Sequence, residues 1–189
     1  MPNWCNNTIT LKHNDPEMLV RAKEALAKGE FLNEFHPVPE DLQIVAGRAG
    51  ADDSPDQIDL VAAEENNLAK FGYRNWYDFC VNEWGTKWDV QDEYAEVKDG
   101  VLTASFDSAW APPTQAYGRL EDLGFEVSAH YFEGGMMFAG SYADGYDDYY
   151  ELGGMSSGAV EALLPEDLNR MFDISETIAN YEEEEAQDE

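Results

Sequence analysis

The order of strand-like and helix-like segments limits the folds that this chain of 189 residues can adopt. Apolar and polar residues alternate in several short segments, as they do in strands that are buried on one face. Between them, apolar residues recur at helical spacing. The predicted strands cover residues 8–11, 86–90, 102–106, 125–131 and 136–142. The predicted helices cover residues 16–28, 60–71, 76–84 and 113–123, followed by one or two helices within 163–186. An α+β fold is therefore expected.

Caps and turns predict where several of these elements end. Asp15 precedes Pro16, which suits the first position of a helix, and Gly29 lies where that helix should stop. Asn75 is a typical N-cap for the helix that follows it. The pair Asp99-Gly100 predicts a tight hairpin turn between two strands.

The predicted order is that of a ferredoxin-like split βαβ sandwich. It would carry a helical insertion at about residues 36–85, an extra C-terminal hairpin and acidic C-terminal helices. We expect residues 1–142 to form the ferredoxin-like domain and residues 143–189 to form an acidic extension. Its last residues, from Glu182 onward, are predicted to be a disordered, solvated tail.

Negative charge is concentrated in the second half of the chain. Residues 89–189 contain 25 acidic and three basic residues, a net charge of −22, and residues 1–88 contain 15 and 8, a net of −7, which sum to −29. Such a field repels nucleic acid and attracts basic surfaces. Hydrophobic residues make up 43% of the chain, which is too many for a disordered acidic protein. A binding surface for a basic partner, a solubilising, halophile-like surface or a cation site would account for this charge.

Three segments resemble a known family. They are residues 2–7 (Pro-Asn-Trp-Cys-Asn-Asn), the Trp-rich stretch 75–89, and residues 108–113 (Ser-Ala-Trp-Ala-Pro-Pro). Over about residues 1–142 the chain resembles the YubB-type ferredoxin-like proteins of conjugative plasmids, phages and prophages. The resemblance implies a ferredoxin-like fold and a mobile-element origin. It implies no activity and no catalytic residue, and the acidic segment after Tyr142 lies largely outside it.

The candidate partner-binding site is a short acidic and aromatic segment that follows the last predicted strand. Its carboxylates would meet a basic surface, and its tyrosines would supply the rigid contact area that is typical of interface anchors. The residues are Asp144, Tyr146, Asp147, Asp148, Tyr149, Tyr150 and Glu151. Carboxylate-rich loops also bind hard cations such as Ca²⁺, but the spacing here does not match an EF-hand. We expect no metal and no other cofactor, since the three histidines also show no ligand spacing.

Other residues that could carry chemistry have structural interpretations. The five tryptophans could stack on bases, but few basic residues accompany them, so they are predicted to lie in the core. Cys5 and Cys80 are expected to be reduced and buried. The stretch 154–158 matches G-x-S-x-G, yet no histidine follows it as a hydrolase would require, so a flexible loop is predicted.

These observations lead to one main functional hypothesis and two rivals. The main hypothesis is an acidic mobile-element protein that binds and inhibits a basic nucleic-acid-binding defence factor of the host, of the restriction or CRISPR type, with nucleic-acid mimicry as one mechanism. The rivals are a small cytoplasmic enzyme of unknown reaction and an acidic structural or accessory protein. No signal peptide and no membrane span are expected, and the host cytoplasm is the expected location.

Overall fold

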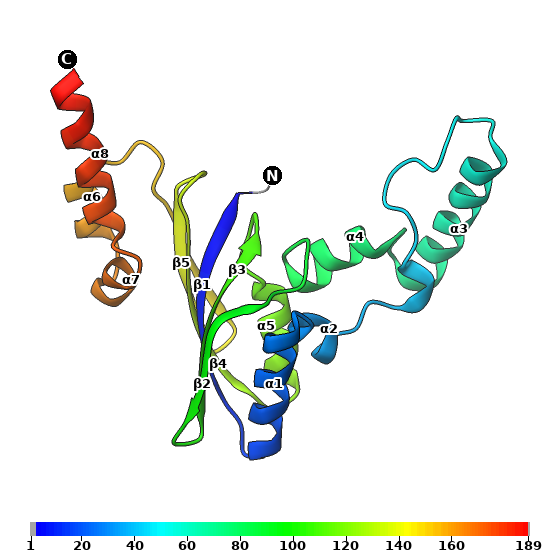
Figure 1. Cartoon of the computed structure of the whole chain (residues 1–189), viewed down its shortest axis with the longest axis horizontal. Coiled ribbons are helices and arrows are strands. Elements are labelled where there is room, and N and C mark those ends of the chain that lie inside the picture. Colours follow the sequence, from blue (N-terminus) through cyan, green and yellow to red (C-terminus); the bar gives the residue numbers. More distant parts are fainter. Residues whose placement is uncertain (1–2, 189) are drawn as a thin grey trace.

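The computed structural model describes the backbone of residues 3–188 and the side chains of residues 3–184. It is an α+β protein built on one six-stranded, open antiparallel sheet (Figure 1). The strands are β1 (Trp4–Lys12), β2 (Asp92–Lys98), β3 (Val101–Ala109), β4 (Glu126–Glu133), β5 (Phe138–Ala143) and β6 (Tyr146–Glu151). They lie in the order β2-β3-β1-β4-β5-β6, so β2 and β6 are the edges.

Helices lie between the strands and after them. In chain order they are α1 (Pro16–Lys28), α2 (Phe31–Phe35), the short 3₁₀ helix η1 (Glu40–Leu42), α3 (Pro55–Phe71), α4 (Trp76–Phe79), the π-helical turn η2 (Cys80–Trp84), α5 (Thr114–Asp122), α6 (Ser157–Leu163), α7 (Glu166–Met171) and α8 (Ile174–Asp188). Among residues 3–188, no helix is long and apolar enough to cross a membrane.

The predicted caps and the first hairpin turn are confirmed. The Asp15 carboxylate accepts a hydrogen bond from the Glu17 N–H at the start of α1, and Gly29 ends this helix with a φ of 71°. The Asn75 side chain accepts hydrogen bonds from two backbone N–H groups at the start of α4. Asp99 and Gly100 both have positive φ, as the turn between β2 and β3 requires.

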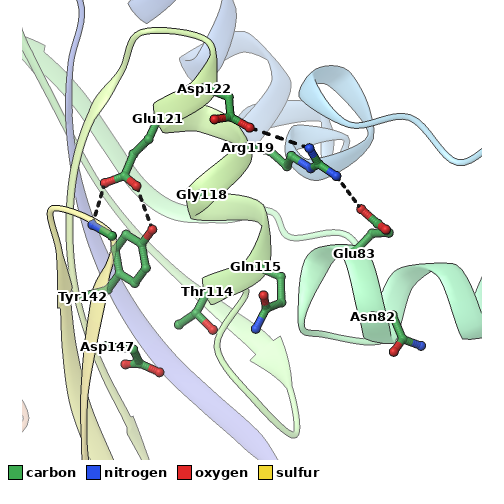
Figure 2. A pocket seen from close by; sticks show the side chains of 11 residues that line it. Asn82, Glu83, Thr114, Gln115, Gly118, Arg119, Glu121, Asp122, Tyr142 and Asp147 are labelled. Atoms are coloured by element: carbon green, nitrogen blue, oxygen red, sulfur yellow. Dashed lines mark hydrogen bonds and ion pairs between the residues drawn. The ribbon is translucent and has the colours of Figure 1, made fainter.

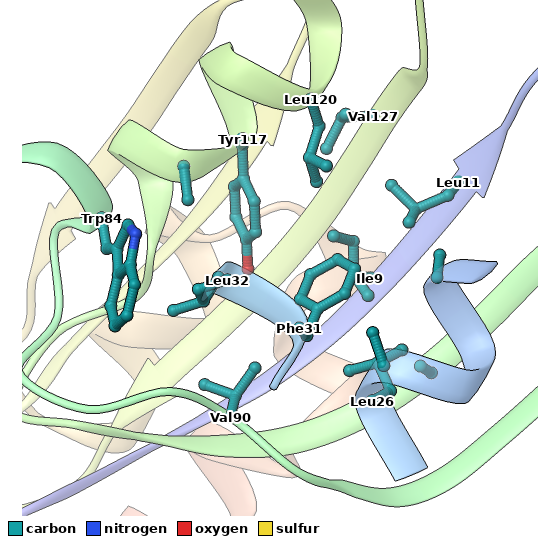
Figure 3. Close-up of a cluster of buried hydrophobic side chains, with 14 of the residues drawn as sticks. Ile9, Leu11, Leu26, Phe31, Leu32, Trp84, Val90, Tyr117, Leu120 and Val127 are labelled. Carbon is teal, nitrogen blue, oxygen red and sulfur yellow. The ribbon is translucent and has the colours of Figure 1, made fainter. Parts of the chain in front are cut away.

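The main hydrophobic core lies between one face of the sheet and the helices α1, α2 and α5, together with η2 (Figure 3). On β1 the side chains alternate in burial, and Cys5, Ile9 and Leu11 are fully buried on this face. Tyr117 of α5 and Phe31 of α2 are among the largest side chains that are fully enclosed. This face therefore carries most of the apolar burial of the molecule.

The helices α6, α7 and α8 lie on the opposite side of the sheet from α1 and α5 (Figure 1). They form a second, smaller core against β5 and the residues that follow β6. Its buried residues are Ala139, Leu152, Val160, Leu164, Leu168 and Ile174. The prediction of one or two helices within residues 163–186 is confirmed by α7 and α8, which Asp173, with a φ of 49°, separates, whereas α6 was not predicted.

The prediction of a disordered tail from Glu182 was wrong, because α8 continues to Asp188. Glu182 accepts hydrogen bonds from the backbone N–H (3.1 Å) and the hydroxyl (2.6 Å) of Ser157, at the start of α6. The carboxylate thus ties the end of the chain to a helix N-terminus, where negative charge is favourable. The last residue of the chain lies outside the described residues.

Residues 86–90 do not form the predicted strand, and β2 starts only at Asp92. Side-chain contacts hold this segment in place. The Asp89 carboxylate accepts hydrogen bonds from the N–H groups of Leu32 (2.8 Å) and Asn33 (2.9 Å), and the Thr86 hydroxyl donates to the Ala109 carbonyl. Thr86 and Val90 are buried but Trp88 is exposed, so burial does not alternate as in a strand, and side-chain contacts with α2 and the end of β3 take the place of strand pairing.

The predicted insertion at about residues 36–85 contains η1, α3, α4 and η2. α3 begins at Pro55, five residues before the predicted start, because Ser54 caps it by accepting a hydrogen bond from the Gln57 N–H. In Figure 1, α3 lies far from the sheet, while η2 lies next to α5. The insertion contributes Leu42 of η1, Phe79 of α4, and Cys80 and Trp84 of η2 to the main core.

Candidate functional site

The predicted site residues lie on β6 and on the turn before it. Asp144 and Gly145 have φ values of 51° and 77° and form the tight turn between β5 and β6. The other six residues form β6 itself, the outer strand of the sheet. The candidate segment is therefore mostly a strand, which fixes the direction of each of its side chains.

Successive β6 side chains point to opposite faces of the sheet. Asp147 and Tyr149 pair with Tyr142 and Gly140 of β5, so they lie on the same face as α1 and α5. Asp148 pairs with Ser141 on the other face, and Tyr150 packs against the second core there. The six predicted residues of β6 therefore divide between the two faces of the sheet, and Asp144 lies in the turn before them.

Asp147 is held by a buried tyrosine from β4. The Tyr131 hydroxyl donates a 2.7 Å hydrogen bond to Oδ1 of Asp147, across the intervening strand β5. The ring can cross β5 because Gly140 has no side chain; a Cβ at Gly140 would collide with the Tyr131 hydroxyl. Although Asp147 is exposed as a whole residue, partial burial of its carboxylate raises its pKa, and the neighbouring Asp148 acts in the same direction.

A pocket of about 480 Å³ lies where β6 meets the start of α5 and the end of β3. Four aromatic side chains and one carboxylate line much of it: Trp110, Tyr131, Phe138, Tyr149 and Asp147. We call it the edge pocket. Tyr131 and Phe138 are buried, whereas Trp110 (43% exposed) and Tyr149 (52%) are open to solvent. The edge pocket thus has a buried aromatic base and exposed aromatic sides.

A second hollow, of about 660 Å³, adjoins the edge pocket along α5 (Figure 2). Figure 2 shows Asp147 on its strand side and Thr114 and Gln115 on its helix side. Its charged groups are largely paired. Glu121 accepts hydrogen bonds from the Tyr142 hydroxyl (2.9 Å) and the Gly145 N–H (3.1 Å), and Arg119 forms ion pairs with Glu83 and Asp122. This hollow therefore offers an incoming ligand fewer unpaired charges than its size suggests.

Glu83 joins the insertion to the body of the molecule. Its carboxylate accepts hydrogen bonds from the Tyr73 hydroxyl (2.5 Å), from Nε2 of His36 (2.8 Å) and from the Arg119 guanidinium (3.1 Å). The Tyr73 hydrogen bond, with those from His36 and Arg119, lowers the pKa of Glu83 to about 2, although partial burial opposes this. Sequence reasoning missed this role, because its partners come from three separate segments.

The prediction that the tryptophans lie in the core was wrong for three of the five. Trp84 is buried, but Trp4, Trp88 and Trp110 are each at least 40% exposed. The rings of Trp4 and Trp88 lie 6.1 Å apart, and the Lys87 ammonium lies 4.7 Å from the Trp88 ring centroid and 4.9 Å from that of Trp110. With Tyr77, these residues form an exposed aromatic surface with one cation at its centre.

Trp110 connects this surface to the edge pocket, because it lines both the edge pocket and a hollow of about 400 Å³ that Tyr77 and Lys87 also line. Its φ of 70° is rare for a residue with a large side chain. The Trp110 N–H donates a hydrogen bond to the Asn3 carbonyl, which helps hold this conformation. Strained backbone of this kind persists where the surrounding structure determines it, and it gathers at functional sites.

The two cysteines are free and buried, as predicted. Burial raises the pKa of the Cys5 thiol far above its usual range and that of Cys80 to about 12. Neither thiol is thus activated as a nucleophile. Ser156 of the G-x-S-x-G stretch caps α6 by accepting a hydrogen bond from the Ala159 N–H. Within the described residues, no group of three or more His, Cys, Asp or Glu side chains is placed to hold a metal ion.

Comparisons with known proteins leave the family open. No family model matches the chain. No curated protein matches it either. Among solved structures, the chain is similar to the protein api92 from Yersinia pseudotuberculosis, which is described by the family model DUF1281. The two share 13% identity over 81% of this chain and 99% of that one, with a TM-score of 0.40. A likeness of this size supports no inference about function.

Proposed function

We propose that this protein is a binding protein that uses the acidic edge of its sheet to occupy a basic surface of a nucleic-acid-binding protein. The observation that carries the proposal is β6, an edge strand with acids on both faces and no basic residue near it in sequence. Residues 120–169, which include β4, β5 and β6, contain eleven acids and no Lys or Arg. Such a surface steers basic partners toward it.

The tyrosines of β6 support a contact role. Tyr146 is 77% exposed and Tyr149 is 52% exposed, although each lies within a regular strand. Exposed tyrosines on a rigid strand lose little conformational entropy when they are buried by a partner, and tyrosine is enriched among the residues that dominate binding energy. The acids would thus provide attraction and orientation, and the tyrosines would provide buried area.

Charge density limits how far this edge imitates nucleic acid. β6 carries three acids, Asp147, Asp148 and Glu151, in six residues, or roughly 20 Å of strand at about 3.4 Å per residue. That is about one charge every 7 Å, whereas duplex DNA presents one per roughly 1.7 Å of its axis. Mimicry would therefore need β6 together with other acids, such as those of α5.

We infer the partner class from the resemblance to the YubB-type proteins of plasmids and phages. A mobile element gains from blocking a host defence factor of the restriction or CRISPR type, and such factors hold nucleic acid on basic surfaces. The proposed mechanism is occupancy in the host cytoplasm, without turnover. We also infer a ferredoxin-like unit from β1 to β4, supported by the strand order β2-β3-β1-β4 and by the helical connections that precede β2 and β4.

The test compares two variants that each lose four negative charges. The first changes the β6 group (Asp144→Asn, Asp147→Asn, Asp148→Asn and Glu151→Gln). The second, its matched control, changes Asp52, Asp53, Asp56 and Asp59 of the insertion to Asn, all of which are exposed. Each immobilised protein is exposed to bacterial lysate at low and high salt. We expect the wild type and the control to retain basic nucleic-acid-binding proteins at low salt, and the β6 variant to lose them.

Two results would contradict the proposal. If the β6 variant retained the same proteins, the partner surface would lie elsewhere. If both variants lost them, binding would depend on the net charge of the protein and not on β6. Charges on an edge strand also prevent the strand from pairing with another sheet. If the role of these acids were to prevent β6 from pairing with another molecule, the β6 variant would self-associate. Light scattering on the purified protein would detect this.

A further inference from the structure

The edge pocket combines two features that recognise a cation. Aromatic side chains supply π faces, which attract cations electrostatically, and Asp147 supplies a formal negative charge. No Lys, Arg or His is among the residues that line it. Trp110 already has the Lys87 ammonium 4.9 Å from its ring centroid, beside the hollow next to the edge pocket, so its π system accepts a cation within this molecule.

The carboxylate in the pocket has fixed geometry and an available acceptor. Oδ1 of Asp147 accepts the Tyr131 hydrogen bond, and Oδ2 has no hydrogen-bond partner among residues 3–184. The neighbouring strand supports this arrangement, since Gly140 leaves the space that the Tyr131 ring occupies. A carboxylate that is oriented before binding loses little freedom when a ligand arrives.

We propose that the edge pocket receives an arginine side chain from the partner protein, with the guanidinium on Asp147 and its plane against the exposed rings of Trp110 and Tyr149. Arginine suits the pocket better than lysine, because its planar fork both stacks on aromatic rings and pairs with a carboxylate. This inference rests on the proposed function, since it gives the basic partner a specific contact. It distinguishes Asp147 from Asp148, which points to the opposite face of the sheet, and from Glu151, which lies beside a separate hollow that neither Trp110 nor Tyr131 lines.

The experiment uses the whole protein and a defined probe, the peptide acetyl-Gly-Arg-Gly-amide. Two further peptides replace arginine with lysine or with citrulline, which keeps the shape of arginine but has no charge. Binding is followed by NMR through the indole N–H of Trp110. Asp147→Asn is compared with Asp148→Asn, which removes the same charge from the next residue but on the opposite face of the sheet. Asparagine at position 147 still offers an oxygen to Tyr131, so the fold should hold.

We expect the arginine peptide to shift the Trp110 signal saturably, with weaker binding of lysine and no saturation with citrulline. Asp147→Asn should raise the Kd for the arginine peptide about tenfold or more, as expected for loss of a charge-assisted hydrogen bond, and Asp148→Asn should change it by less than about twofold. Equal effects of the two substitutions would show that the edge pocket is not a specific arginine site, while the acidic edge could still be a binding surface. Equal binding of citrulline would also overturn the proposed arginine site. If the arginine peptide binds at Asp147 while lysate proteins are retained equally by the β6 variant, the pocket stands as an arginine site and the proposed role of β6 as the partner surface fails.

Discussion

The two faces of the sheet differ in how much structure covers them. On one face, helices α1, α2 and α5 with η2 bury a cluster of 23 hydrophobic residues, whereas α6, α7 and α8 bury six on the other. Because apolar burial is the main stabilising contribution, the first face should determine the global free energy of unfolding. The second should open locally at lower cost. The acidic edge strand β6 belongs to the sheet and has one side chain, Tyr150, in the smaller core.

The largest expected effect is on the first face. Trp84 is 4% exposed, packs edge-to-face on Phe79 and donates a hydrogen bond to the His36 carbonyl. Trp84→Ala should lower the free energy of unfolding by about 3–5 kcal/mol, measured by urea denaturation. Trp88→Ala is the control, because Trp88 is half exposed and should cost less than about 1 kcal/mol. Similar losses of unfolding free energy from both substitutions would show that the difference in burial between the two tryptophans does not determine their contribution to stability.

The next effect concerns the Glu83 hydrogen bonds, which fasten the insertion to α5. A carboxyl whose pKa is lowered by folding contributes stability above its unfolded pKa and loses that contribution as pH falls toward its folded pKa. Since the pKa of Glu83 falls to about 2, we expect up to roughly 3 kcal/mol to be lost between about pH 5 and pH 2. Glu83→Gln should remove most of this acid-dependent part of the denaturation curve. An unchanged pH dependence in the variant would contradict the assignment.

The second face is tested by Leu168→Ala. Leu168 is fully buried between α7 and the sheet, so the substitution should cost the C-terminal unit about 2 kcal/mol or more. Hydrogen exchange should show faster exchange in α6 and α8 than in the wild type, while the amides of β1 and β3 keep their protection. Equally faster exchange in β1 would mean that the two faces unfold as one unit and that the second face does not open locally.

The smallest effect is expected for Glu182→Gln, which weakens the link between α8 and the start of α6. Hydrogen bonds to Ser157 lower the pKa of the exposed Glu182 carboxyl, so a neutral side chain should fit this position less well. Only the first amides of α6 should exchange faster, and the midpoint of thermal unfolding should stay the same within error. A clear drop in that midpoint would show that the contact between Glu182 and Ser157 contributes more to global stability than the exposure of Glu182 suggests.

Sequence patterns predicted the elements that depend on local chemistry. The α1 caps and the Asp99-Gly100 turn follow from backbone preferences of single residues, and both are present. Asp144-Gly145 forms the same kind of turn, so the signal for β6 was in the sequence. No strand was predicted after this turn, and four carboxylates in eight residues are indeed unusual in a strand. The edge position of β6 explains how the sheet accommodates them.

The candidate site was only partly predictable. Asp147 and Tyr149 were identified from composition, but the edge pocket also needs Trp110, Tyr131 and Phe138, which come from the end of β3, from β4 and from β5. A glycine inside a predicted strand, Gly140, was the one local sign that another group approaches the backbone there. Trp110 is exposed and has a positive φ, and no composition rule predicts either property.

The absence of a side chain at Gly140 restricts which residues related sequences can carry at two other positions. Tyr131, Gly140 and Asp147 lie on three adjacent strands, and the hydrogen bond between the outer two depends on the smallness of the middle one. The three positions should therefore change together among related chains. A relative with alanine or a larger residue at the position of Gly140 should have a shorter side chain in place of Tyr131. Its β6 carboxylate would then lack the hydrogen bond from the tyrosine hydroxyl that orients it. This covariation could be sought in sequences alone, before any partner is known.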